Sequence, residues 1–204
     1  MKSKICKILF CRKFAMLFHA RGYSMLEMVV VLGIVTLVST VVLANYPAFN
    51  ERLGVRRAAE DIASSIRQAQ SFGLGVKEFG PGSGIFPGYG ISFERYASTG
   101  VPATFYTLYA DSNNNLAYDT GETISYRTIQ GKAVVDDICA DQKQATPGPC
   151  GINYFFVEYS RPRPSVSLQS DAGFFYNDVE IKIKGSRGTT KTIVIWYSGQ
   201  VSIE

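Results

Sequence analysis

Histidine is almost missing from this chain of 204 residues, because the single histidine, His19, lies among the first 22 residues. The rest of the chain therefore cannot form a Ser-His-Asp triad, a Cys-His pair or a histidine-ligated metal centre. It also lacks a phosphate-binding glycine loop and a nucleophile elbow, and its carboxylates form no recognisable catalytic pair. The sequence therefore predicts a protein that is not an enzyme.

Acidic residues are missing from residues 1–22, although this segment contains six basic residues: Lys2, Lys4, Lys7, Arg12, Lys13 and Arg21. The whole chain has 21 basic and 17 acidic residues, so the remainder has 15 basic and 17 acidic ones, a net charge of −2. The basic character of the chain is thus no argument that its main part binds nucleic acid. With 46% apolar and 19% charged residues, the composition also excludes global disorder and a polytopic membrane protein.

Only one apolar run is long enough to cross a bilayer. Met28–Ala44 has no charged residue, and extending it to Tyr46 gives about 19 residues, enough for a membrane-spanning helix. Basic residues before the run outnumber those just after it, which favours a cytoplasmic N-terminus. A buried core helix fits this uncharged, mostly β-branched run poorly. The run is therefore a signal anchor, a secretory signal cut after Ala44, or a segment whose role depends on the residues before it.

Those preceding residues are Gly22-Tyr23-Ser24-Met25-Leu26-Glu27. A carboxylate at the edge of an apolar helix costs up to about 3 kcal/mol if it is drawn to the middle of the bilayer. One interpretation leaves Glu27 in the headgroup layer. The whole string, however, resembles the cleavage signature of type IV prepilins and type II secretion pseudopilins. It departs from that signature only at Tyr23, Ser24 and Met25, where the family usually has Phe, Thr and Leu.

The resemblance implies that a membrane peptidase cuts between Gly22 and Tyr23, which removes the leader 1–22, and that Tyr23 is then N-methylated. It also implies that Glu27 is the glutamate that directs filament assembly. The freed amine lies four residues from Glu27, and residues at that spacing are neighbours on a helix. The amine could therefore pair with its own Glu27 or with that of a neighbouring subunit, which would fix the register between packed subunits.

The fold expected from the sequence is α+β, a long kinked N-terminal helix packed on an antiparallel β-sheet domain. Pro47 predicts a kink, and Asn50 is placed to cap a restart of the helix. An apolar stripe of helical period then continues to about Phe72: Val55, Ala58, Ala59, Ile62, Ile66 and Ala69. The predicted segments are a leader over 1–22, a transmembrane helix over 23–46, an amphipathic helix over 47–75 and a β domain over 76–204.

Nine strands are expected in the β domain, and several alternate between apolar and polar residues. Their predicted ranges are Gly90–Glu94, Thr104–Ala110, Thr123–Ile129, Lys132–Ile138, Asn153–Tyr159, Val166–Gln169, Asp178–Lys184, Lys191–Tyr197 and Gln200–Ile203. Ser198-Gly199 predicts a tight hairpin between the last two. The helix followed by Tyr89–Phe93, together with this hairpin, resembles the minor pilins and pseudopilins of the GspH/FimT kind most.

A loop rich in Asp and Asn follows the second predicted strand. Its oxygen ligands are spaced as in an EF-hand calcium loop: side chains at Asp111, Asn113, Asn115, Asp119 and Glu122, and the carbonyl of Ala117. Position six is Leu116 instead of glycine, and strands flank the loop, so it is not an EF-hand. The interpretations are a calcium-binding loop that closes a β-hairpin, or a polar hairpin whose residues tolerate turns.

Two further groups of residues carry expectations. In an exported domain, Cys139 and Cys150 predict one disulfide that closes a short loop, while Cys6 and Cys11 stay with the leader. Basic residues gather around a hairpin near the C-terminus and could contact DNA phosphates, or they could guard a sheet edge. These basic residues are Lys182, Lys184, Arg187 and Lys191.

The sequence thus predicts a structural subunit of a type IV pilus, a type II secretion pseudopilus or a DNA-uptake filament. No cofactor is required, apart from the calcium considered above. The expected partners are other pilin or pseudopilin subunits, the prepilin peptidase and an inner-membrane assembly platform. The protein would be held in the inner membrane by one span, with its C-terminal domain periplasmic or extracellular, before it joins the filament. The alternative is a secreted β domain, ligand-binding or enzymatic, released after Ala44.

Overall fold

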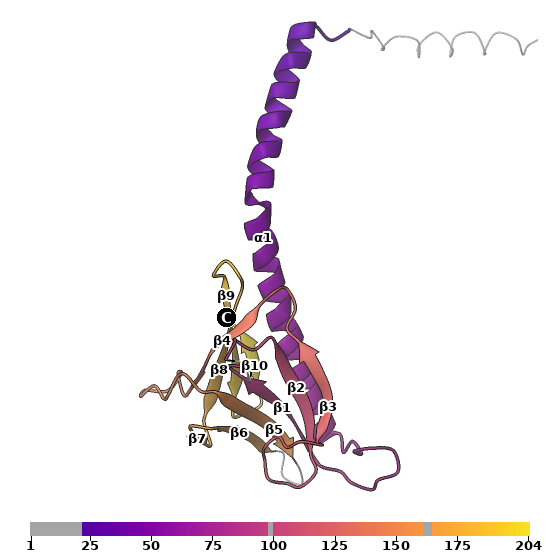
Figure 1. The fold of residues 1–204 in the computed structure, drawn as a ribbon, viewed down its shortest axis with the longest axis vertical. Coiled ribbons are helices and arrows are strands. Elements are labelled where there is room, and N and C mark those ends of the chain that lie inside the picture. Colours follow the sequence, from indigo (N-terminus) through magenta and orange to yellow (C-terminus); the bar gives the residue numbers. More distant parts are fainter. Residues whose placement is uncertain (1–21, 98–99, 161–164) are drawn as a thin grey trace, which may run out of the picture. The chain divides into compact units, whose positions relative to one another are not determined.

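The structure is a computed structural model that describes residues 22–97, 100–160 and 165–204. The predicted leader, apart from Gly22, lies outside the described residues. The chain divides into two compact units, residues 1–46 and residues 47–204. One helix, α1 (Met25–Leu74), belongs to both units and continues through Pro47 (Figure 1). Asn50 therefore lies inside the helix and does not cap a second one, whereas the kink at Pro47 stays a prediction.

Within the described residues of the second unit, ten strands follow the helix. They are β1 (Gly88–Glu94), β2 (Phe105–Asp111), β3 (Thr123–Thr128), β4 (Val134–Ala140), β5 (Tyr154–Ser160), β6 (Ser165–Ser170), β7 (Gly173–Phe174), β8 (Asp178–Lys184), β9 (Thr190–Trp196) and β10 (Val201–Ile203). All nine predicted strands are present, and their ends differ from the prediction by at most two residues. The short strand β7 was not predicted, since two residues carry no periodicity.

The strands form two antiparallel sheets. The larger sheet has the order β3-β2-β1-β5-β6-β7, and the smaller has the order β10-β9-β8-β4 (Figure 1). Ser198 and Gly199 form the predicted turn between β9 and β10, in which the Trp196 amide donates to the Gln200 carbonyl over 2.9 Å. The α+β class and the antiparallel pairing are therefore confirmed. The division into two sheets was not predicted, because local periodicity does not show which strands pair when they are far apart in the sequence.

The second half of α1 packs on both sheets. All six residues of the predicted apolar stripe are buried, and Ile62 and Ile66 share one core with Ile91 of β1 and Ile181 of β8. Small residues allow close approach: a Cβ built on Gly73 would overlap the Tyr159 carbonyl of β5. Buried Ser65 also shares a 2.8 Å hydrogen bond with Tyr106 of β2. The amphipathic prediction for this half is thus confirmed.

Candidate functional site

The first half of α1 carries an uncovered apolar surface. Its valine, leucine, isoleucine and methionine side chains from Met25 to Leu43 are exposed by 45% or more. The polar side chains here bond back to the helix, since Thr36 donates to the Leu32 carbonyl over 2.7 Å and Asn45 to the Val41 carbonyl over 2.9 Å. Such bonds satisfy polar groups without water. Among the described residues, this one helix is long and apolar enough to cross a membrane, which is compatible with a single-pass membrane protein.

The start of α1 explains part of the sequence around Glu27. Ser24 directly precedes the helix, and its hydroxyl oxygen accepts a 3.1 Å hydrogen bond from the Glu27 backbone amide. Ser followed three residues later by Glu is the pattern of a capping box, which the sequence interpretation above missed. Glu27 also lies in the first turn, where a negative charge is favourable to the helix dipole. Local helix capping is therefore a second reason for an acid at this position.

Gly22 lies just before the helix and is not required there by packing among the described residues. No described atom lies within 4 Å of a Cβ built on Gly22. Tyr23 is exposed. Packing among the described residues therefore gives no reason for a glycine at position 22.

The loop from Asp111 to Glu122 connects β2 and β3 and is held by its own acidic side chains. Asp111 accepts the amides of Asn115 at 3.0 Å and Leu116 at 2.8 Å. Glu122 accepts the amide of Ser112 at 2.8 Å and that of Asp119 at 3.1 Å. Both carboxylates are almost fully buried, at 0% and 4% exposure. Asp111 and Glu122, the first and last residues of the loop, are therefore buried inside it and hold its backbone.

The remaining predicted calcium ligands converge on Asp119. Its Oδ2 accepts the side-chain amides of Asn113 at 2.9 Å and Asn115 at 2.7 Å. The Asn115 side-chain oxygen accepts the backbone amide of Ala117 at 2.9 Å. Leu116, at position six, has φ +65°, the left-handed conformation that glycine adopts most easily. The structure thus brings the predicted residues into one loop, and it gives position six a glycine-like backbone.

A buried acid from another strand lies against this loop. Glu158 of β5 is 1% exposed, and its carboxyl lies within hydrogen-bonding reach of Asp111. Burial and the charge of Asp111, with a smaller effect of Glu122, raise the pKa of Glu158 to about 8. Burial and the charges of Glu158, Asp111 and Glu122 raise the pKa of Tyr109 well above its usual value. No sequence signal pointed to Glu158, because it is 36 residues from Glu122.

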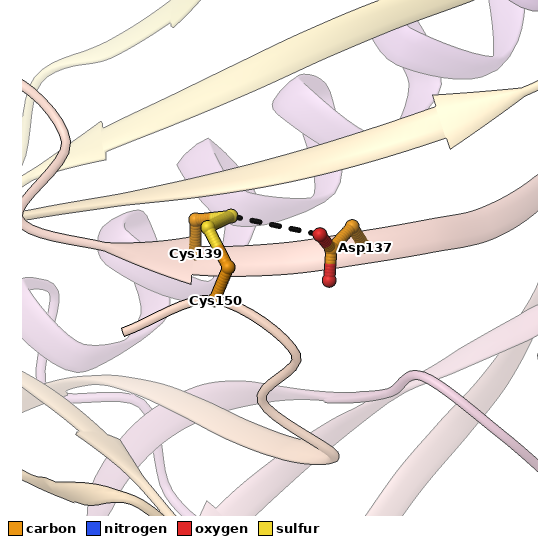
Figure 2. A group of neighbouring side chains, drawn as sticks. All are labelled: Asp137, Cys139 and Cys150. Atoms are coloured by element: carbon orange, nitrogen blue, oxygen red, sulfur yellow. Dashed lines mark hydrogen bonds between the residues drawn. A yellow bond between two sulfur atoms is a disulfide. The ribbon is translucent and has the colours of Figure 1, made fainter. Parts of the chain in front are cut away.

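The predicted disulfide is present. Cys139 at the end of β4 is bonded to Cys150, and their Cα atoms are 4.0 Å apart (Figure 2). Asp137 lies beside the bridge, 3.7 Å from the Cys139 sulfur. Because both sulfurs are used in the bridge, neither offers a thiolate to a metal, and Asp137 instead accepts the Gly151 amide over 3.1 Å. The cluster is thus a structural clamp for the loop between the cysteines.

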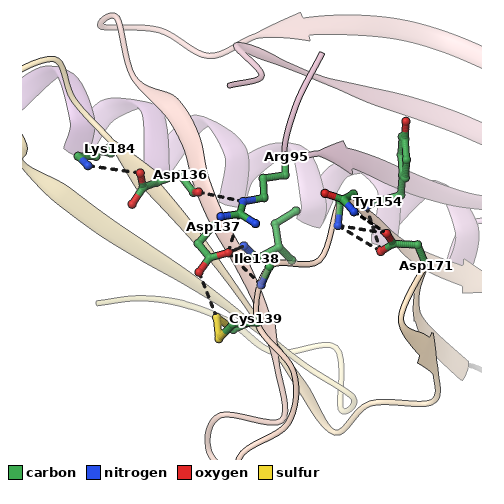
Figure 3. Close-up of polar contacts among 11 residues, drawn as sticks. Arg95, Asp136, Asp137, Ile138, Cys139, Tyr154, Asp171 and Lys184 are labelled. Atoms are coloured by element: carbon green, nitrogen blue, oxygen red, sulfur yellow. Dashed lines mark hydrogen bonds and ion pairs between the residues drawn. A yellow bond between two sulfur atoms is a disulfide. The ribbon is translucent and has the colours of Figure 1, made fainter. Parts of the chain in front are cut away.

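Arg95 connects the two sheets close to this clamp. It follows β1 of the larger sheet, and its Nε donates to the Asp136 carbonyl over 3.3 Å and lies 3.6 Å from Asp137 (Figure 3). Both aspartates belong to β4 of the smaller sheet, where the pairing with β8 shifts in register. Such an irregularity re-aims side chains. These contacts give Asp136 and Asp137 a structural role between the two sheets.

The four basic residues near the C-terminus do not share one face. Lys182 pairs with Thr192, whereas Lys191 pairs with buried Ile183, so the two lysines are on opposite faces of the smaller sheet. Lys184 lies 3.4 Å from Asp136 (Figure 3), and Arg187 lies 4.0 Å from Glu51. Their charge is thus divided and partly neutralised.

Glu51 of α1 is a structural acid that the sequence did not reveal. It is 9% exposed, and its Oε1 accepts the backbone amide of Arg187 at 2.7 Å and that of Thr189 at 3.4 Å. These amides belong to the turn between β8 and β9, so Glu51 attaches that turn to the helix.

Comparison of the chain with protein-family models, with curated proteins and with solved structures gave no match. The structure supports the coarser part of the family resemblance, a long N-terminal helix with an apolar first half and a second half packed on antiparallel sheets.

Proposed function

We propose that this chain is a minor pilin or pseudopilin, a membrane-stored subunit that is cleaved after Gly22 and joins a filament through its N-terminal helix. The observation that carries the proposal is the continuous apolar surface of residues 25–43, which begins next to the string Gly22–Glu27 and whose side chains are exposed among the described residues. Removing one such valine, leucine or isoleucine side chain from water is worth about 1.5–3 kcal/mol. A surface of this size therefore requires lipid or neighbouring helices.

The same surface suits both environments. Lipid tails are about as apolar as leucine, so transfer of the helix from bilayer to filament changes the hydrophobic free energy little. Packing and charge then decide the register between subunits. Glu27 is the acid nearest the apolar run, and an unpaired carboxylate in an apolar filament core costs about 3 kcal/mol or more. A free amine at Tyr23, on the same subunit or on its neighbour, would remove that cost.

Substitutions at Glu27 separate charge pairing from helix capping. Glu27→Gln keeps a side chain that suits a capping box but removes the charge, whereas Ser24→Ala removes the cap and keeps the charge. If charge pairing directs assembly, Glu27→Gln lowers incorporation into filaments sheared from the producing cells by tenfold or more, and Ser24→Ala lowers it by less than about threefold. Membrane-fraction immunoblots check that both variants accumulate to equal levels. Wild-type incorporation of Glu27→Gln would refute the proposed role of this charge.

The mass of the mature protein tests the cleavage site. We expect a first residue Tyr23 carrying one methyl group, and retention of the leader in Gly22→Leu, because the larger side chain blocks recognition and leaves the packing of the described residues unchanged. Gly33→Ala is the control, since a Cβ there also meets no atom within 4 Å. Intact-mass measurement distinguishes the outcomes. A mature chain that starts at Asn45 would instead establish the secreted β domain released after Ala44.

A further inference from the structure

Two buried polar atoms without a partner belong to residues near the loop that connects β2 and β3. In the part of the chain that the structure describes, four side-chain oxygens are buried and unpartnered: Glu51 Oε2, Tyr109 Oη, Glu158 Oε2 and Tyr159 Oη. Two of them belong to Glu158 and Tyr109, the residues that flank Gly90 on its two sides in the larger sheet, because both residues pair with it. A buried polar group without a partner is costly, so two such groups at one place indicate a missing partner.

Glycines in β1 clear the space between these groups. Of the positions of β1 that alternate with the core residues Ile91 and Phe93, positions 88 and 90 are both glycine. A Cβ on Gly88 would overlap the Glu158 carboxylate, and one on Gly90 would lie 2.6 Å from the Tyr109 hydroxyl. Glu158 on β5 can therefore reach across β1 to Asp111 on β2. The two glycines in the central strand β1 leave room for the Glu158 side chain, so that this buried acid can approach the loop.

The three buried acids at this place offer oxygen ligands to a cation. Asp111, Glu122 and Glu158 are each at most 4% exposed. Two buried acids in contact repel each other when both are ionised, and the backbone amides that hold Asp111 and Glu122 do not reach the free oxygen of Glu158. Within the described residues no basic side chain is recorded in contact with Glu158, so protein charge does not offset the cluster.

We propose that the loop from Asp111 to Glu122 and Glu158 of β5 together form a calcium site, in which Glu158 is a ligand from outside the loop. The donors are oxygens only, from carboxylates, asparagine side chains and the Ala117 carbonyl, which is the set that Ca²⁺ prefers. Rotation of the Asn113 and Asn115 amides would exchange their nitrogens, which now face Asp119, for oxygens. The left-handed Leu116 gives the loop the backbone bend that glycine gives an EF-hand.

The test uses the full chain in detergent micelles, where no filament forms, so that it is independent of the assembly proposal. Calorimetric titration of the metal-free protein with Ca²⁺ should give a dissociation constant of about 10⁻⁴–10⁻³ M, as for extracellular calcium modules. At 10 mM Ca²⁺ the melting temperature should rise by about 3–10 °C over an EGTA control, and 10 mM Mg²⁺ should give less than a third of that shift.

Glu158→Gln tests the new ligand. We expect it to weaken Ca²⁺ binding at least tenfold, whereas Glu60→Gln, an exposed acid on α1, should bind as the wild type does. If Glu158→Gln does not fold, Glu158→Asp retains the charge but withdraws the carboxylate by one methylene, and it should weaken binding in the same direction. Tb³⁺ bound to the wild type should be excited through Tyr109 and Tyr118, whose rings are 5.7 Å apart, and displaced by Ca²⁺.

Two results would overturn the proposal. Absence of calcium binding and of a melting shift in the wild type at 10 mM Ca²⁺ would remove the site altogether and would leave the filament proposal untouched. Wild-type affinity in the variants of Glu158 would confine the metal to the loop and remove Glu158 from its ligands.

Discussion

Glu51 offers a sharp test of how the helix is attached to the sheets. This acid from α1 accepts two backbone amides of the turn between β8 and β9, and a Cβ on Gly185 in that turn would lie 2.5 Å from its Oε1. In Glu51→Ala those amides of the turn lose their acceptor. The turn cannot move away freely, because Gly185 and Thr189 are joined by a 2.8 Å backbone hydrogen bond.

The expected loss follows from these contacts. A hydrogen bond to a charged group contributes about 1.5–3 kcal/mol, and Glu51 accepts one short amide bond and one long one, so Glu51→Ala should lower the free energy of unfolding by about 2–4 kcal/mol. For a unit of this size that is a fall in melting temperature of about 4–16 °C. Thermal unfolding of the detergent-solubilised chain, followed by the fluorescence of Trp196 in β9, measures it.

Glu60 supplies the matched control on the same helix. It is exposed and pairs with Arg56 one turn away over 2.9 Å. Such a surface pair contributes about 0.3–0.5 kcal/mol, so Glu60→Ala should lower the melting temperature by about 1–2 °C. Equal losses in the two variants would refute the view that Glu51 acts through the turn, because helix propensity alone would then explain both.

Three other predictions concern the clamp, the helix and the glycines. The precursor should show two free thiols before reduction and four after it, and removing the Cys139–Cys150 bridge should cost about 3 kcal/mol of unfolding free energy in a denaturant titration. Ile62→Ala should cost about 2–5 kcal/mol by the same method, whereas Leu37→Ala, in the exposed apolar half, should leave the unfolding of the sheets unchanged. Gly90→Ala should cost about 1–3 kcal/mol, because the new Cβ would meet the Val157 carbonyl at 2.5 Å; an unchanged melting temperature would show that Tyr109 and β5 separate without cost.

The fold was predictable where a local period defines an element. The stripe from Val55 to Ala69 repeats with the helical period, and its members are the residues that the sheets bury. Val179, Ile181 and Ile183 alternate with Glu180, Lys182 and Lys184, and the apolar set faces the core. The predicted restart at Asn50 was wrong, because a proline lacks only one amide donor and the flanking residues still favour helix.

The pairing of distant strands was not predictable, and the acids that matter most depend on it. In the sequence, Glu51 resembles any other charged residue on the polar face of a helix. It is buried only because the turn between β8 and β9 lies against it. Glu158 lies in β5, where Phe155, Val157 and Tyr159 alternate as core residues. From this alternation alone, Glu158 would be expected to point away from the core into solvent. Its contact with Asp111 requires that β1 lie between β2 and β5, which no spacing in the sequence specifies.

Leu116 shows how a motif defined by residue type can differ from one defined by geometry. The absence of glycine at position six argues against an EF-hand, because glycine is the residue that adopts a left-handed backbone at least cost. The loop nevertheless reaches φ +65° at Leu116, and its amide there bonds to Asp111 over 2.8 Å. A left-handed leucine costs about 1–2 kcal/mol, an amount comparable to that one hydrogen bond to a carboxylate. The ligand spacing is therefore the more informative part of the pattern, since the bend can be imposed on another residue by the acid that the spacing provides.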